Sequence, residues 1–264
     1  SMLRESFGGR LRFAVSGGAP LHPFIGEFFR IAGMELLEGY GLTETSAAAT
    51  CSRPGDNRIG SVGPPIPGVR IRVAASGEIL VRGDSVFREY HDAPEDTRVA
   101  FDEAGWFRTG DTGWIDADGR LIITGRLKDL IITSGAKNVA PQHVEGSLKM
   151  SPLIDEAMVF GDRRRYVVAL LDLHPEALDA LAREYKLPTG DRATLVAHPH
   201  VQQAIQREVD LANQRLARYE QVRRFDIIPE RLSVGGGGLS HSLKLEREKV
   251  AERYQDRIDA LYDE

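Results

Sequence analysis

The sequence is poor in cysteine, and Cys51 is the only one among its 264 residues. A single thiol cannot form an internal disulfide, and it lacks the companion ligands of a zinc site. We interpret Cys51 as a buried or incidental thiol. Because single-cysteine usage fits a reducing compartment, we expect a cytoplasmic location.

Long apolar runs are also missing. No stretch approaches the roughly 18–20 consecutive apolar residues that span a bilayer, and the first residues show no signal-peptide pattern. The net charge of −5 gives no broad attraction to nucleic acid, so we expect no nucleic-acid partner. Peripheral contact with a membrane remains open, because a local basic patch can exist within a mildly acidic total.

The remaining composition is that of an ordinary globular protein. Hydrophobic residues make up 42% and charged residues 28% of the chain, which is enough to form a core. The length fits one large or two modest domains.

The first half has the pattern of an α/β region followed by a β-rich region. We expect a buried strand within residues 10–18, a helix at 20–32 with an apolar face, and a short strand at 35–40. Between residues 60 and 125, short alternating runs separated by turn residues predict a barrel or twisted sheet, with a hairpin at 113–119.

The composition changes near Arg126, and from there we expect a compact α+β domain. The expected strands are 130–133 and 225–228, with a hairpin of 156–160 and 166–173. The expected helices are 141–150, 175–185, 198–219 and 244–261, and the four glycines of 235–238 predict a flexible run. The helix at 198–219 carries an apolar stripe that we interpret as core packing: Val201, Ile205, Val209, Ala212 and Leu216.

Two segments in the first half suit nucleotide binding. In the first, the ring of Tyr40 offers a flat face for a base. The hydroxyl of Thr43 and the adjacent carboxylate of Glu44 can together hold phosphate and a magnesium ion. In the second, Asp111 follows a glycine turn and can accept from both ribose hydroxyls. The alternatives are a turn with a polar tip and an Asx turn that caps a strand.

Two further segments carry charge at points where the chain can move. Residues 125–129 (GRLKD) and 134–138 (SGAKN) suit a hinge between domains, or an ordinary exposed turn. Lys244 follows the glycine run, and a lysine on a mobile loop can reach a site and retract. The alternative is a flexible surface lysine.

Taken together, the order and spacing of these four segments resemble the adenylate-forming superfamily of acyl-CoA synthetases, firefly luciferases and peptide-synthetase adenylation domains. The resemblance runs from Leu11 to the C-terminal helix. The extended segment between Leu187 and Glu220 looks more like the long-chain fatty acyl-CoA synthetases than the shorter aryl or acetyl types.

The resemblance implies an AMP-forming ligase that uses ATP and Mg²⁺ to convert a fatty acid to acyl-AMP and then transfers the acyl group to CoA. It implies an α/β fold in two parts. Residues 1–125 would be the C-terminal portion of the large AMP-binding domain, with an α/β and a β-barrel-like subdomain. Residues 126–264 would be the small, mobile α+β domain.

The resemblance also assigns roles to individual residues. Those for binding ATP or AMP and CoA are Gly17, Gly18 and Ala19 at the adenine, Gly39, Tyr40 stacking on the base, Asp111 and Arg126 at the ribose, and Ser134 and Gly135 near the thioester-forming site. Those for catalysis and motion are Thr43 at phosphate, Glu44 at Mg²⁺, Lys244 in adenylation, and Lys128 as the hinge.

Three departures from the family pattern stand out. The family often has proline at the position of His241 and a basic residue at the position of Glu246. Both differences affect how tightly the loop that carries Lys244 docks. The family's phosphate-binding loop lies upstream of the Gly17 turn, and nothing between Ser1 and Arg10 resembles it. We therefore expect a C-terminal fragment, inactive alone, whose partner is a missing N-terminal part of the same enzyme.

Two alternatives stay open. One is a non-catalytic nucleotide-binding or scaffold protein derived from such an enzyme. A protein freed from catalysis has no chemical need to keep all of Thr43, Glu44, Asp111, Arg126 and Lys244, which argues against it. The other is a superfamily member that acts on an aryl or other carboxylic acid.

Overall fold

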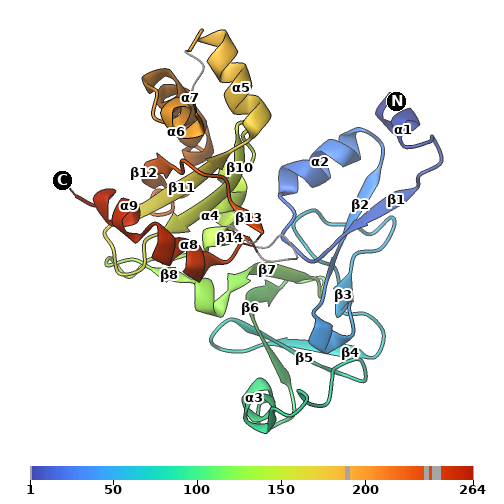
Figure 1. Ribbon diagram of the computed structural model, residues 1–264. Coiled ribbons are helices and arrows are strands. Elements are labelled where there is room, and N and C mark those ends of the chain that lie inside the picture. Colours follow the sequence, from blue (N-terminus) through green and yellow to red (C-terminus); the bar gives the residue numbers. More distant parts are fainter. Residues whose placement is uncertain (1, 188–190, 235–237, 240–244, 264) are drawn as a thin grey trace. The chain divides into compact units, whose positions relative to one another are not determined.

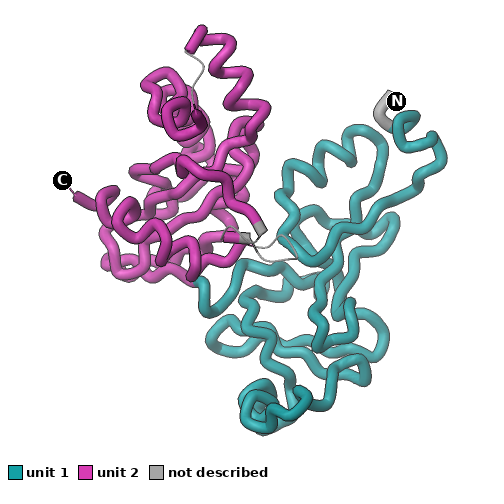
Figure 2. The backbone as a smooth tube through the Cα atoms, in the orientation of Figure 1, with its two compact units in different colours: residues 1–129 teal, residues 130–264 magenta. Residues whose placement is uncertain are grey.

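The computed structural model describes residues 2–187, 191–234, 238–239 and 245–263 (Figure 1). The chain forms two compact units, unit 1 (Ser1–Asp129) and unit 2 (Leu130–Glu264), coloured separately in Figure 2. The division falls four residues after the boundary expected at 125, so Arg126 and Lys128 belong to unit 1. The reason is local, since Arg126 ends a strand of unit 1 and the short helix after it packs beside the same sheet.

Unit 1 begins with a small mixed sheet in the order β1-β2-β3. Strand β1 (Phe13–Ser16) is parallel to β2 (Glu35–Tyr40), and β3 (Thr50–Cys51) is antiparallel to β2. Helix α1 (Met2–Ser6) precedes this sheet, and α2 (Pro23–Ile31) connects its parallel strands. His22 caps α2 and proline occupies its first turn, as expected for a helix start.

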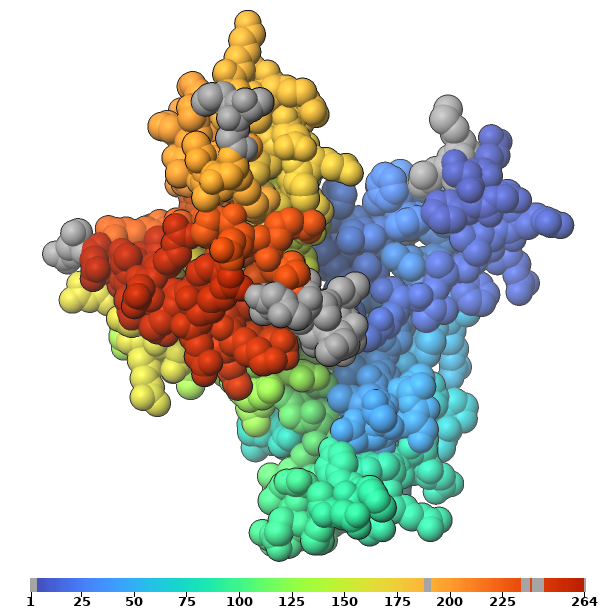
Figure 3. All heavy atoms as spheres, in the orientation of Figure 1, coloured from blue at the N-terminus to red at the C-terminus, as the bar shows by residue number. Residues whose placement is uncertain are grey.

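The expectation that β1 is buried was wrong. Val15 is 59% exposed, and the apolar face of α2 is also exposed, with Phe28 at 48% and Ile31 at 82%. Strand β1 is the edge of its sheet, and the residue of α2 that is buried is Gly26, which lies against Ile59. Figure 3 shows this blue region of α1, β1 and α2 at the surface of unit 1.

The β-rich half of unit 1 is an open antiparallel sheet, a half-barrel, in the order β4-β5-β6-β7. Its strands are β4 (Val69–Val73), β5 (Glu78–Gly83), β6 (Phe107–Ile115) and β7 (Leu121–Arg126). The hairpin expected at 113–119 is confirmed as the β6–β7 turn. Helix α3 (Pro94–Ala100) and the 3₁₀ turns η1 (Thr43–Thr45) and η2 (Leu127–Asp129) complete the unit.

Unit 2 is built around a mixed sheet in the order β10-β11-β12. Strands β10 (Ile154–Phe160) and β11 (Val167–Leu173) form the expected hairpin, and β12 (Val222–Ile227) is parallel to β11. The short pairs are β8 (Ile131–Ile132) with β9 (Asn138–Val139) and β13 (Ser233–Val234) with β14 (Gly238–Leu239). The helices are α4 (Pro141–Leu148), α5 (Pro175–Glu184), α6 (Arg192–Val196), α7 (Pro199–Asn213), α8 (Arg247–Arg253) and α9 (Gln255–Ala260).

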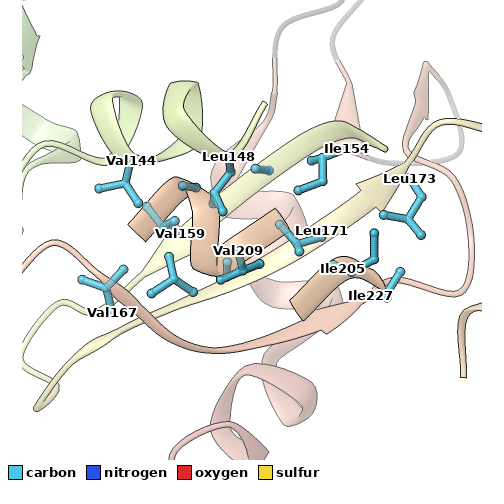
Figure 4. Close-up of a cluster of buried hydrophobic side chains, with 14 of the residues drawn as sticks. Val144, Leu148, Ile154, Val159, Val167, Leu171, Leu173, Ile205, Val209 and Ile227 are labelled. Carbon is cyan, nitrogen blue, oxygen red and sulfur yellow. The ribbon is translucent and has the colours of Figure 1, made fainter. Parts of the chain in front are cut away.

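Both faces of this sheet are covered, which explains why every residue of β11 is buried. Alternate residues of β11, such as Val167 and Leu171, belong to a core shared with α4, α5, α6 and α7 (Figure 4). The residues between them, Val168 and Leu170, pack in a second core with α8 and α9. A strand buried on both faces reads as a continuous apolar run, as VVAL does here.

Two helices of unit 2 differ from their expected bounds. Helix α7 ends at Asn213 rather than at 219, because the Asn213 side chain accepts from the backbone N–H of Val222 and donates to its carbonyl, both at 2.9 Å. The expected helix 244–261 is two helices that divide at Tyr254. The apolar stripe of α7 is buried as expected.

The α/β class expected from the sequence is confirmed by these mixed sheets with their covering helices. Among the described residues, no helix combines the length and apolar character that crossing a membrane requires. Of the expected glycine run, residues 235–237 lie outside the described residues.

Candidate functional site

The carboxyl ends of β1 and β2 bring two of the expected glycine segments together. The strands are parallel and in register from Phe13 with Glu35 to Ser16 with Glu38. Gly17 and Gly39 follow this pairing, and a Cβ on Gly17 would lie 3.2 Å from the Gly39 carbonyl oxygen. Gly18 has a φ of +83°, which favours glycine, and Ala19 is exposed beside it. The ends of parallel strands are a common place for ligands in α/β folds.

The turn after β2 folds back on itself. A Cβ on Gly41 would lie 1.5 Å from the Ala47 carbonyl oxygen, so this position requires glycine. Thr45 is fully buried, and its hydroxyl accepts a hydrogen bond from the backbone N–H of Leu42 at 2.9 Å. The same hydroxyl lies 3.0 Å from the Ala47 carbonyl oxygen. Thr43 is exposed on this turn. The tight turn therefore fixes the backbone that carries Thr43 and Glu44.

Tyr40, Asp111 and Arg126 come together although they lie far apart in the sequence. The Tyr40 hydroxyl donates to Oδ2 of Asp111 at 2.7 Å, and Nε of Arg126 donates to Oδ1 at 3.1 Å. Asp111 and Arg126 are direct partners in the β6–β7 ladder. Asp111 is only 6% exposed. Burial and the Asp111 carboxylate raise the pKa of Tyr40, so its hydroxyl stays protonated and donates.

This arrangement leaves Asp111 with acceptor capacity. A carboxylate has about four lone-pair positions, and Tyr40 and Arg126 use one on each oxygen. Thr109 stabilises this part of β6. Its hydroxyl accepts a hydrogen bond from the backbone N–H of Asp111 at 3.0 Å and donates one to the Ile79 carbonyl at 2.8 Å. The cluster can hold hydroxyl donors in a fixed place.

Glu44 is half-buried, and its Oε1 accepts a hydrogen bond from the Tyr90 hydroxyl at 2.9 Å. Partial burial and the Glu44 carboxylate raise the pKa of Tyr90 to about 12. A carboxylate beside the Thr43 hydroxyl fits Mg²⁺, which usually binds one or two protein carboxylates together with substrate phosphates and water. No group of three or more potential metal-ligating side chains gathers within the described part of the chain.

Sequence reasoning missed Tyr90 and Thr109. Tyr90 lies 46 residues from Glu44, and no periodicity or spacing joins them. Thr109 lies within a segment that we singled out, but its neighbour Asp111 drew the assignment. A surface hollow of about 530 Å³ lies against Tyr90, Asp96 and Arg108 and contains none of the expected site residues.

The expected site residues outside this cluster are Lys128, Ser134, Gly135 and Lys244. Lys128 is exposed in η2, two residues before the boundary between the units. Ser134 and Gly135 are exposed in the turn between β8 and β9, where the Ser134 N–H donates to the Arg164 carbonyl at 2.9 Å. Lys244 and His241 lie outside the described residues. Glu246 occupies the N-cap position of α8 without a side-chain capping hydrogen bond, and it pairs with Lys249 at 2.8 Å.

Comparison with curated proteins gives relatives along almost the whole chain. A long-chain-fatty-acid–CoA ligase, FadD15 of Mycobacterium tuberculosis, is 42% identical over 261 residues, covering 98% of this chain and 43% of that protein. The human long-chain-fatty-acid–CoA ligase ACSBG1 is 37% identical over 271 residues, covering 94% of this chain and 37% of that protein. The chain thus spans less than half the length of these relatives.

Solved structures give a similar result. The adenylation domain of a carboxylate reductase from Mycobacterium chelonae matches with a TM-score of 0.79 and 28% identity, covering 98% of this chain and 40% of that one. O-succinylbenzoate coenzyme A synthetase (MenE) of Bacillus subtilis, solved with ATP and magnesium, matches with a TM-score of 0.70 and 26% identity, covering 94% and 50%.

Family comparison covers both units. Residues 2–91 match the family described as AMP-binding enzyme. Residues 128–264 match the AMP-binding enzyme C-terminal domain. The second match alone extends over more than half of the chain, and the chain therefore belongs to the AMP-binding enzyme family.

Proposed function

We propose that the chain is part of an AMP-forming long-chain fatty acid–CoA ligase. The observation that carries this proposal is the cluster of Tyr40, Asp111 and Arg126. Tyr40 precedes the Thr43–Glu44 turn by three residues in the sequence. An aromatic ring, hydroxyl acceptors and a metal-binding carboxylate are the groups that a bound adenine nucleotide requires. Relatives named as long-chain fatty acid–CoA ligases support the substrate class.

In the proposed reaction, a carboxylate oxygen of the fatty acid attacks the α-phosphorus of ATP and the bond to pyrophosphate breaks. The sulfur of CoA then attacks the acyl carbon, the thiol proton is lost, and AMP leaves. The first step concentrates negative charge at one phosphorus, so catalysis depends mainly on positioning and electrostatic stabilisation. Mg²⁺ bound at Glu44 would supply positive charge to the phosphates.

Each described site residue has a role in this proposal. The Gly17–Ala19 turn and Gly39 allow adenine to approach the backbone, and the Tyr40 ring stacks on it. Asp111 and Arg126 bind the ribose, and Thr43 contacts phosphate. Lys244 assists adenylation, a role that rests on its place in the sequence.

The two units take different parts in the proposal. Unit 1 is the C-terminal portion of the large AMP-binding domain, and unit 2 is the small mobile domain that turns about Lys128. Ser134 and Gly135 then serve the thioester-forming step with CoA. An upstream part of the same enzyme supplies the phosphate-binding loop. A cytoplasmic location with peripheral membrane contact completes the proposal.

A second candidate differs in the acid. Structures similar to this chain include the carboxylate reductase adenylation domain and the O-succinylbenzoate coenzyme A synthetase described above. These names favour an aryl or other carboxylic acid as an alternative substrate for the same adenylation chemistry.

The experiment that tests the proposal compares this chain with an upstream-extended form of the length of its relatives. Acyl-AMP and acyl-CoA formation are measured with ATP, CoA and a panel of fatty and aryl acids. We expect activity in the extended form alone, highest with long-chain fatty acids. A preference for aryl acids would favour the second candidate, and absence of acyl-AMP with every acid would refute the adenylation proposal.

A further inference from the structure

Tyr90 and Glu44 form a contact that the proposed function does not use. The Tyr90 hydroxyl donates to Oε1 of Glu44 at 2.9 Å, and both residues are half-buried. Among the described residues, no donor bonds the second oxygen of Glu44, Oε2. One oxygen is therefore tied to the protein and the other is available.

The segment that carries Tyr90 holds the Glu44 turn at two more points. The backbone N–H of Phe87 donates to the Glu44 carbonyl at 2.8 Å. The Ser46 hydroxyl donates to the Ser85 carbonyl at 2.8 Å. Hydrogen bonds thus fix both the backbone and the carboxylate of Glu44 to the 85–90 segment that follows β5.

Tyr90 is itself held in place by its surroundings. Its backbone N–H donates to the Thr97 hydroxyl at 2.9 Å, and its ring lies 4.6 Å from the ring of Phe87. Phe87 packs in turn on Phe101 and Phe107, each with ring centroids 5.4 Å away. The hydroxyl therefore comes from a side chain anchored at its backbone and at its ring, which suits it to orient another group.

We propose that Tyr90 is a positioning residue that orients the Glu44 carboxylate so that Oε2 binds the divalent cation that accompanies ATP. This inference rests on the proposed function, which assigns the cation to Glu44. Carboxylates that bind metals are commonly held by a hydrogen bond from a second residue, and loss of that residue typically costs 10–100-fold in metal affinity. Tyr90→Phe keeps the ring packing and removes only the hydroxyl.

The test measures binding of Mn²⁺, in the presence of ATP, to the upstream-extended protein by electron paramagnetic resonance. Four proteins are compared with the unsubstituted one: Tyr90→Phe, Glu44→Gln, the double variant, and Tyr262→Phe. Tyr262 is a matched control because its hydroxyl also lies within hydrogen-bonding distance of protein oxygens, the carbonyls of Phe160 and Tyr166, but in unit 2. Thermal unfolding of each variant is followed in parallel.

We expect Tyr90→Phe to weaken Mn²⁺ binding by about tenfold, with Tyr262→Phe unchanged. In the Glu44→Gln background, adding Tyr90→Phe should weaken binding no further, because the hydroxyl acts through the carboxylate. A general loss of structure would instead lower the unfolding temperature and add to the effect of Glu44→Gln.

Unchanged Mn²⁺ binding in Tyr90→Phe, or full additivity with Glu44→Gln, would overturn the inference. So would the absence of any Mn²⁺ binding with ATP, because Glu44 would then hold no cation. Failure of the proposed function is seen separately, as absence of acyl-AMP from a protein that still binds Mn²⁺ and ATP.

Discussion

Asp111 and Arg126 lie directly opposite each other in the β6–β7 ladder, and Nε of Arg126 donates to Oδ1 of Asp111 at 3.1 Å. The pair is set by strand register, so a shift of one residue would place the two side chains on opposite faces of the sheet. Tyr40 reaches the same carboxylate from a different sheet. The cluster therefore links the two sheets of unit 1 as well as forming the candidate ribose site.

Replacement of Asp111 should destabilise unit 1. Asp111→Ala leaves the hydroxyl of Tyr40 without its acceptor, and we expect a loss of about 2 kcal/mol in the free energy of unfolding. Urea unfolding followed by tryptophan fluorescence measures it, because both tryptophans, Trp106 and Trp114, lie in unit 1. Asp118→Ala is the control, since the Asp118 side chain is 62% exposed and its ion pairs should contribute less than about 1 kcal/mol. Equal losses in the two variants would contradict the prediction.

Substitutions of Tyr40 separate its ring from its hydroxyl. If the ring stacks on adenine, Tyr40→Ala should weaken AMP binding to the upstream-extended protein by about 10–100-fold, since base stacking contributes about 1–3 kcal/mol. Tyr40→Phe should change it by less than about threefold, because the ring is kept. Titration calorimetry with AMP measures both. Comparable weakening in the two variants would assign the effect to the hydroxyl and its bond to Asp111.

The turn after β2 should not tolerate a side chain at Gly41. A Cβ there would lie 1.5 Å from the Ala47 carbonyl oxygen, so Gly41→Ala must displace the backbone that carries Thr43 and Glu44. We expect a loss of about 3 kcal/mol or more in the free energy of unfolding of unit 1. Gly39→Ala is the matched control in β2, where the nearest atom is at 3.4 Å, and should cost less than about 1 kcal/mol. A small effect of Gly41→Ala would mean that the turn rearranges freely.

Glu38, near the end of β2, should make the stability of unit 1 depend on pH. Burial raises its pKa above the ordinary value of 4.5, and the hydrogen bond from the Gly60 N–H opposes this only in part. Below pH 4.5 the carboxyl is protonated in both states, so it has no effect. As the pH rises through the raised pKa, the folded state must bury a charge that the unfolded state leaves in water, and stability falls.

The variant Glu38→Gln should therefore be more stable than the unsubstituted protein at pH 7. The difference should disappear below the ordinary carboxyl value of 4.5. Urea unfolding of both proteins across pH 4–8 measures this difference in the free energy of unfolding. The contributions of the other carboxylates cancel, because both proteins contain them. A difference that does not change with pH would show that the pKa of Glu38 is the same in the folded and unfolded states, which contradicts the prediction.

In unit 2, a partly buried ion pair holds the start of α8. Glu145 is 7% exposed. Its Oε1 accepts hydrogen bonds from Nη2 of Arg247 at 2.6 Å and from the backbone N–H of Val159 at 2.9 Å. Arg247→Leu should cost about 3–5 kcal/mol, because the Glu145 carboxylate then stays buried without its partner. Lys249→Gln, on the same helix, removes an exposed pair with Glu246 and should cost less than about 1 kcal/mol. Urea unfolding followed by far-ultraviolet circular dichroism compares the two, and equal effects would contradict the prediction.

The parts of the fold that sequence reasoning predicted are those with a strong local pattern. Strand β2, the β10–β11 hairpin and helix α4 have clear periodicity, and their bounds fall within two or three residues of expectation. Helix α7 was expected to be longer because its apolar stripe continues to Leu216, but the contact of Asn213 with Val222 ends it. Periodicity shows which face of a helix is apolar, but it does not show that the side chain of Asn213, the last residue of the helix, bonds the backbone of a distant strand at Val222.

The candidate site shows the same limit. Tyr40, Asp111 and Arg126 were singled out for their chemistry, and the structure brings them together. Tyr90 had no such signal, because its relation to Glu44 depends on the path of the chain after β5. The sequence predicted the position of β1 but not its exposure, since a run of alternating apolar residues looks the same whether its outer face is covered or, like Val15, exposed.

The most direct test of the proposed function is the product stoichiometry of the upstream-extended protein with ATP, CoA and a long-chain fatty acid. We predict one AMP and one pyrophosphate for each acyl-CoA formed, with acyl-AMP accumulating when CoA is omitted. Formation of ADP and phosphate, or of acyl-CoA without AMP, would contradict the assignment of this chain to an AMP-forming ligase.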